Sequence, residues 1–120
     1  MTAWTRAAAT LVAAAFIAMT AVPPAAALTD AEAEKLYTDY HRSIRIYELC
    51  KKVDLSDEEI GALGNEINER IEHKIGAKRL KLLTAAQRDA KQMHKDLGCD
   101  HYDVRYYVRL FLQDLKPVLE

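Results

Sequence analysis

The residues best suited to chemistry lie in one short stretch, HKDLGCDHYDVRYY at positions 94–107. It places Cys99 between His94 and His101, while the other of the chain's two cysteines, Cys50, lies far upstream. Thiolate and imidazole groups are the ligands that zinc prefers. A closed tetrahedral zinc site would use Cys50, His94, Cys99 and His101. The same two cysteines could instead pair, as they do in most short exported chains.

The spacing of these residues favours a disulfide over zinc. Cys99 and His101 flank a single residue, and the sequence contains neither a CxxC nor an HxxxH pair. We therefore predict a Cys50–Cys99 disulfide. Closing a loop of about 50 residues stabilises a fold by roughly 4 kcal/mol in the chain-entropy description.

Acidic residues gather near the same two cysteines in the sequence. Carboxylates that converge from two loops can bind a hard cation such as calcium. The candidate ligands are Asp54, Asp57, Glu58, Asp100, His101 and Asp103. Acids are also common at helix N-termini, where the backbone N–H groups favour negative charge. No EF-hand pattern is present, so a metal-cation site is the alternative interpretation here.

Two further groups of residues predict binding surfaces. A basic stripe with seven-residue spacing comprises Lys74, Lys81, Arg88 and Lys95. An aromatic and basic group follows it, with Tyr102, Arg105, Tyr106 and Arg109. The stripe is typical of a solvated helix face, or of a face that docks on an acidic partner or an anionic membrane surface. The second group is typical of core packing or of a recognition patch, because tyrosine combines an apolar ring with a polar tip.

Signals for catalysis are weak throughout the chain. The four histidines are scattered, and no nucleophile lies in a recognisable motif. The sequence has no glycine-rich phosphate loop, no CxxCH haem-attachment site and no ExxH pair for a di-iron centre. We therefore expect no enzymatic activity and no cofactor.

The first 27 residues have the layout of a secretory signal peptide. Arg6 precedes an uncharged, apolar stretch over 7–29, which Pro23 and Pro24 interrupt. Small residues at 25–27 then match the requirements of a signal peptidase. We predict cleavage after Ala27 and a periplasmic or secreted protein. An uncleaved membrane anchor is the alternative, since about 20 apolar residues can span a bilayer.

The remainder, residues 28–120, is expected to form a single helical domain. Arg6 is the only one of the 17 basic residues in 1–27, and none of the 18 acidic residues lies there, which leaves a formal charge of −2. Such a charge argues against a nucleic-acid-binding protein. A domain of this size has a thin core, which a disulfide would help to stabilise.

Helical periodicity dominates residues 28–120. We predict four helices, at about 30–52, 57–75, 77–97 and 101–116. Capping boxes at Thr29 and Ser56 begin the first two, and Gly98 ends the third. A break at Gly76 is needed to bring both cysteines to one end, because an unbroken 57–97 helix would hold them apart. The expected fold is a small all-α up-down four-helix bundle.

Two glycines lie inside the second predicted helix. Gly61 and Gly64 each cost about 1 kcal/mol of helix stability relative to alanine. We expect either the close approach of a neighbouring helix or fraying near the helix start.

These patterns together predict a small exported helical binding or accessory protein that acts through a helix face. The expected partner is another envelope protein, with an anionic membrane surface as a further candidate and nucleic acid excluded. The alternative is a periplasmic protein that binds a metal cation at its acidic end.

Overall fold

The computed structural model describes residues 27–120 of the 120-residue chain. These residues form an all-helical structure without β-strands. Its α-helices are α2 (Asp30–Lys51), α3 (Asp57–Arg70), α4 (Arg79–Leu97) and α5 (Tyr102–Leu110). A 3-10 turn over Gly76–Lys78 precedes α4, and a π-helical turn (Phe111–Leu115) and a 3-10 turn (Lys116–Leu119) continue α5. The predicted signal peptide, apart from Ala27, lies outside the described residues.

Both predicted capping boxes are present. The Thr29 hydroxyl accepts from the Glu32 N–H at 3.1 Å, and the Glu32 carboxylate accepts from the Thr29 N–H at 2.8 Å. Ser56 and Glu59 repeat this exchange at 3.1 and 3.0 Å at the start of α3. Each box satisfies two N–H groups that have no partner inside the helix, so these two helix starts follow directly from local sequence.

The second helix ends earlier than predicted. α3 stops at Arg70 rather than near residue 75, because Glu72 and His73 adopt left-handed backbone angles, with φ of 59° and 57°. The turn still buries Ile71 and Ile75, which pack into the core. Gly76 follows with φ of 45°, a conformation that glycine adopts without steric cost. The predicted break between the second and third helices is thus confirmed.

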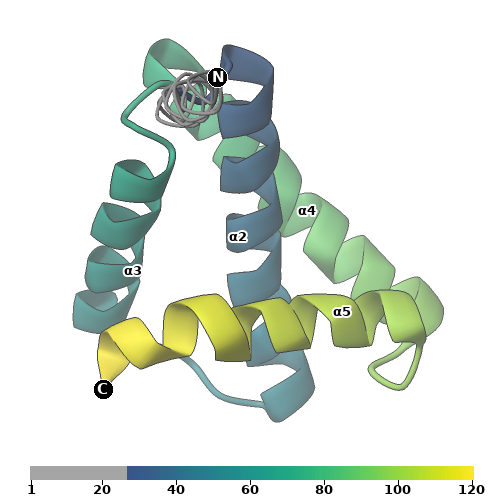
Figure 1. Cartoon of the computed structure of the whole chain (residues 1–120). Coiled ribbons are helices and arrows are strands. Elements are labelled where there is room, and N and C mark those ends of the chain that lie inside the picture. Colours follow the sequence, from purple (N-terminus) through teal and green to yellow (C-terminus); the bar gives the residue numbers. More distant parts are fainter. Residues whose placement is uncertain (1–26) are drawn as a thin grey trace, which may run out of the picture.

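Helix α2 is the centre of the arrangement. Figure 1 shows α3 on one side of α2 and α4 on the other, and α2 contacts α3, α4 and α5. The chain alternates in direction through α2, α3 and α4, as expected. Helix α5 instead crosses the lower part of α2, and its C-terminal 3-10 turn contacts α3. The expected up-down arrangement is therefore wrong for the last helix.

The reason for this crossing lies in the two clusters of buried side chains. Ile46 and Ala90 form a small cluster between α2 and α4, which Val104 of α5 completes. Phe111 and Leu115 are buried in the larger cluster, between α2 and α3. A helix that contributes to both clusters must cross α2. The larger cluster comprises Ala33, Tyr37, Tyr40, Ile44, Leu63, Ile67, Ile71, Ile75, Phe111 and Leu115.

Two arginines connect α2 to its neighbours by hydrogen bonds. In the Arg70 network, the guanidinium donates to Glu66 at 2.7 Å, to the Tyr40 hydroxyl at 3.0 Å and to the Asp114 carbonyl at 3.0 Å. The Tyr40 hydroxyl in turn donates to the Asp114 carboxylate at 2.8 Å. Because these groups belong to α2, α3 and the π-helical turn, the network fixes three elements at once.

Arg42 of α2 makes the second connection. It donates to the Tyr107 hydroxyl of α5 at 2.8 Å and to Asp89 of α4 at 3.2 Å. Its guanidinium carbon also lies 5.4 Å from the centre of the Tyr107 ring, which adds a cation–π contact. Sequence spacing gives no sign of this role for Arg42, because its partners are distant in sequence.

Candidate functional site

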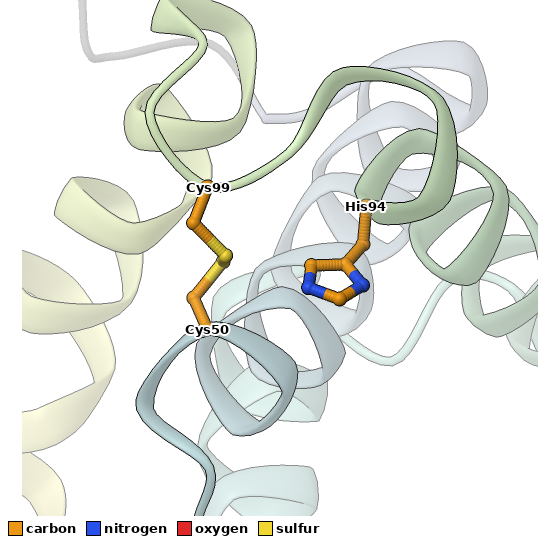
Figure 2. A group of neighbouring side chains, drawn as sticks. All are labelled: Cys50, His94 and Cys99. Carbon is orange, nitrogen blue, oxygen red and sulfur yellow. A yellow bond between two sulfur atoms is a disulfide. The ribbon is translucent and has the colours of Figure 1, made fainter.

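The predicted disulfide is present and closes one corner of the fold. Cys50 lies in the last turn of α2, and Cys99 lies in the turn between α4 and α5. Their Sγ atoms are 2.09 Å apart and their Cα atoms 5.7 Å apart. Figure 2 shows the bond joining the two elements. The disulfide thereby fixes the start of α5 beside the end of α2.

His94 lies next to this disulfide. It projects from the last turn of α4, and Figure 2 shows its ring on the side of the two sulfurs. One ring nitrogen and the two Sγ atoms all lie within 4.8 Å of one another. Within residues 27–120 the ring makes no hydrogen bond or ion pair, which leaves both nitrogens available.

His101, the fourth ligand of the alternative zinc site, has a different role. Its Nδ1 accepts a hydrogen bond from the Asp103 N–H at 3.1 Å, so the side chain caps α5. It does not belong to the group that Cys50, His94 and Cys99 form. The four-ligand zinc site is therefore wrong for the structure, which instead joins the two thiols covalently.

A groove of about 460 Å³ runs beside the disulfide along α5. Both cysteines line it, together with Lys51, Arg105 and Arg109. Asp100 is the one acidic residue in its lining, and the apolar part consists of Val108 and Leu112. Three cations against one carboxylate give the groove a positive balance.

The outer side of α5 carries the predicted aromatic and basic residues, which we call the α5 face: Tyr102, Arg105, Tyr106 and Arg109. The side chains of Tyr102 and Tyr106 are 74% and 50% exposed. In the described part of the chain, neither arginine side chain forms an ion pair or a hydrogen bond. Tyr102 and Tyr106 are therefore not core residues. The neighbouring Tyr107 is half-buried, and its hydroxyl accepts a hydrogen bond from Arg42.

The predicted basic stripe is only partly a feature of α4. Lys81, Arg88 and Lys95 lie exposed on α4, but Lys74 lies in the preceding turn. Lys74 pairs with Glu72 at 3.2 Å and donates to the Leu28 carbonyl, so it has a structural role. The three exposed residues are hereafter the α4 stripe. Leu80, 74% exposed, lies beside the stripe in a shallow groove of about 540 Å³.

The acidic end does not form a compact set of ligands. Asp54, Asp57, Glu58, Asp100 and Asp103 are all exposed. Among the described residues, one group of three potential metal ligands has all its ligand atoms within 4.8 Å of one another, and it consists of Cys50, His94 and Cys99. Asp57 and Glu58 lie in the first turn of α3, and Asp103 lies in the first turn of α5. The helix dipole stabilises negative charge at these positions.

A third groove, which no sequence pattern predicted, lies between α2 and α4. It measures about 400 Å³, and Arg45, Glu48, Arg88 and Lys91 contribute to its lining. Arg45 pairs with Glu48 at 3.3 Å, and Glu48 also accepts from the Leu55 N–H at 3.0 Å. Glu48 thus holds the turn after α2, which leaves Arg88 and Lys91 as the cations of this groove.

His41 has the most perturbed proton affinity that the structure shows. Burial, together with the smaller effect of the positive charge of Arg79, lowers the pKa of His41 to about 4. Its ring packs on Tyr37, with the ring centres 4.3 Å apart. A half-buried imidazole that packs against an aromatic ring is typical of a structural role.

The described residues define a class: a small all-helical protein in which a disulfide joins the end of α2 to the turn before α5. Within residues 27–120, no helix has both the length and the apolar character that crossing a bilayer requires. The chain matches no family model, no curated protein and no solved structure.

Proposed function

We propose that this chain is an exported, non-enzymatic binding or accessory protein whose α5 face docks on an acidic surface of another envelope protein. The observation that carries the proposal is the alternation of two exposed tyrosines with two arginines that lack partners in the described structure. Tyrosine and arginine are the residues most enriched, with tryptophan, among those that dominate binding energy in protein interfaces.

The surroundings of the α5 face support an acidic partner. Lys51 adds a third cation to the adjoining groove, in which only Asp100 is acidic. The guanidinium group binds a carboxylate through two parallel N–H bonds, and it is weakly hydrated, so it suits interfaces better than an ammonium group does. The exposed Leu112 supplies apolar area at the end of the same groove.

The α4 stripe is the competing surface, and it favours an anionic membrane as its target. Its three cations form one line without the tyrosines of the α5 face. Lipid headgroups attract such a line through charge alone. The acidic end does not support a second function, because its carboxylates form no close group within the described residues.

Photocrosslinking from the α5 face tests the proposal. A benzophenone amino acid replaces Tyr106, and the purified protein is irradiated in an extract of exported proteins from the producing cells. We expect one discrete adduct, whose crosslinked peptide maps to an acidic surface of the partner. The double variant Arg105→Glu, Arg109→Glu should weaken binding at least about thirtyfold, the scale of losing an interface hot spot, and should abolish the adduct.

The matched control places the same change of charge on the α4 stripe, as Lys81→Glu, Lys95→Glu. This variant should retain the adduct, because its substitutions lie on another helix. An adduct that persists in the α5 variant, or no discrete adduct at all, would contradict the proposal. Binding to phosphatidylglycerol vesicles that only the α4 variant loses would identify the membrane as the target instead.

A further inference from the structure

The disulfide corner holds three side chains that suit a soft metal ion. Cys50, His94 and Cys99 supply two sulfurs and one imidazole nitrogen within 4.8 Å of one another. Thiolate and neutral imidazole are the preferred ligands of zinc. In the oxidised protein both sulfurs are used in the S–S bond, so the set is complete only after reduction.

We infer that reduction of the Cys50–Cys99 disulfide converts this corner into a zinc site with Cys50, His94 and Cys99 as its three protein ligands. The disulfide and the metal site are then two states of the same side chains. Three protein ligands leave the fourth tetrahedral position of zinc to water or another small ligand. This inference does not depend on the proposed function, since it concerns other residues and another partner.

The distances require only small movements. Tetrahedral zinc bonds of about 2.3 Å to sulfur and 2.0 Å to nitrogen place two sulfur ligands about 3.8 Å apart, and sulfur and nitrogen about 3.5 Å apart. The sulfurs must therefore separate by about 1.7 Å from the bonded 2.09 Å. Rotation of the two cysteine side chains supplies this, because Cys99 lies in a turn and its Cα is 5.7 Å from that of Cys50.

The position of His94 also fits the site. Its ring lies beside the sulfurs in Figure 2 and is half-buried. No hydrogen bond or ion pair within residues 27–120 competes for its nitrogens. The backbone is already fixed, since α4 ends here with the Gly98 N–H bonded to the His94 carbonyl at 3.0 Å. The imidazole therefore needs no new backbone conformation to reach a metal ion.

The chemistry balances with a dithiol as reductant. The dithiol gives two electrons and two protons to the Cys50–Cys99 bond, forms its own disulfide and leaves two protein thiols. Zinc binding then displaces the two thiol protons, while His94 binds through the lone pair of its neutral ring. Thiol–disulfide exchange with a second disulfide reverses this: the two thiolates form the Cys50–Cys99 bond, the other disulfide takes the two electrons and becomes a dithiol, and the ion is released.

Cobalt provides the direct test, because Co²⁺ replaces Zn²⁺ and its thiolate complexes absorb strongly. The full mature chain is reduced under anaerobic conditions with a phosphine, cleared of reductant and titrated with Co²⁺ and then Zn²⁺. We expect one ion per chain, thiolate-to-cobalt absorption that zinc abolishes, and no such signal from the oxidised protein. Far-ultraviolet circular dichroism follows the fold in the same samples.

Two variants complete the design. His94→Ala should weaken zinc binding at least about tenfold, since loss of an outer-sphere partner alone costs about 10–100-fold. His101→Ala is the matched control and should bind as the wild type does, because His101 caps α5. If the reduced apo protein unfolds, zinc should restore its helical signal, because a metal that binds only the native state stabilises it.

Several results would overturn the inference. One is the absence of stoichiometric binding by the reduced protein, folded or not. Others are an affinity that His94→Ala leaves unchanged, equal loss in the His101→Ala control, and cobalt absorption that the double variant Cys50→Ser, Cys99→Ser retains.

Discussion

Removing the disulfide should cost this protein a large part of its stability. The bond joins residues 49 positions apart, so the unfolded chain that it constrains contains a loop of more than half of the described residues. In the chain-entropy description, opening such a loop lowers the free energy of unfolding by about 4 kcal/mol. A small domain has only about 5–15 kcal/mol in total. The melting temperature should fall by roughly 15–30 °C.

The native state adds little to this loss. Cys50 is half-buried at the edge of the smaller cluster, whose buried members are Ile46, Ala90 and Val104. Alanine at position 50 therefore removes one sulfur from a partly exposed site, and the Cys99 turn is half-exposed as well. The dominant effect lies in the unfolded chain, so the variant should have the same fold with a lower unfolding midpoint.

Urea unfolding of the oxidised protein and of Cys50→Ala, Cys99→Ala measures the difference, with circular dichroism as the probe. The denaturant dependence should be steeper for the variant, because its unfolded state exposes more surface. The reduced wild-type protein, kept with a metal chelator, should match the variant. A loss no larger than the roughly 1 kcal/mol of an average substitution would refute the reasoning. It would mean that the reduced unfolded chain stays as compact as the linked one.

Further tests address the Arg70 network, two glycines and His41. Tyr40→Phe removes a hydroxyl that bonds to two partners in the Arg70 network and should lower the free energy of unfolding by about 1 kcal/mol. Tyr37→Phe is its control and should cost less; equal costs in urea unfolding would contradict the role of the network. Gly76→Ala should destabilise by about 1 kcal/mol, because φ there is +45°. Gly61→Ala should stabilise by roughly 0.5–1 kcal/mol in helix α3, where nothing lies within 4 Å of an added Cβ; the same sign of change in both melts would refute this contrast. Because the pKa of His41 is lowered by burial to about 4 from 6.5, the unfolded state binds more protons between these values. His41 should therefore remove about 2 kcal/mol of stability between pH 7 and pH 5, on top of any change from other groups. His41→Gln should lack this part of the loss, and an identical pH dependence of urea unfolding would show that the wild-type imidazole titrates normally.

The features that sequence predicted well are those determined by neighbouring residues. The Thr29 and Ser56 capping boxes use side chains three positions apart, and both are present. The disulfide followed from the small number of cysteines and from the break at Gly76, and both are confirmed. In each case the stabilising contact, or the lack of an alternative partner, can be read from the sequence alone.

The end of α3 shows where local patterns fail. Ile67, Ile71 and Ile75 continue a helical spacing, which predicted a helix to residue 75, and all three are buried. The last two nevertheless reach the core from a turn, because Glu72 and His73 adopt left-handed angles that no glycine or asparagine signals. For Ile71 and Ile75 the spacing agrees with burial but not with the backbone that buries them, and other positions of apolar spacing, such as Ile60 and Leu80, are exposed. Local sequence also left open a close helix contact at Gly61 and Gly64. The structure shows none, because nothing lies within 4 Å of a Cβ placed at either position.

The candidate site was predictable in its residues and not in its geometry. The sequence favoured core packing over exposure for Tyr102 and Tyr106. Both are exposed, because Val104 and Phe111 occupy the buried side of α5 and its extension. The spacing of Cys99 and His101, without a CxxC or HxxxH pair, gave no reason to place His94 beside the cysteines. The turn between α4 and α5 brings Cys99 close to His94, which sequence spacing cannot express.

The disulfide corner explains why α5 can present an exposed aromatic face at all. α5 contributes Val104 to the smaller cluster and Phe111 and Leu115, through its π-helical extension, to the larger one. A helix with so few buried residues gains limited stability from burial, because each buried side chain contributes only about 1.5–3 kcal/mol before entropy is subtracted. The Cys99 bond, placed three residues before Tyr102, holds the start of α5 to α2 without using any side chain of the helix itself. The outer positions of α5 are therefore free to carry tyrosine and arginine rather than residues that packing would require.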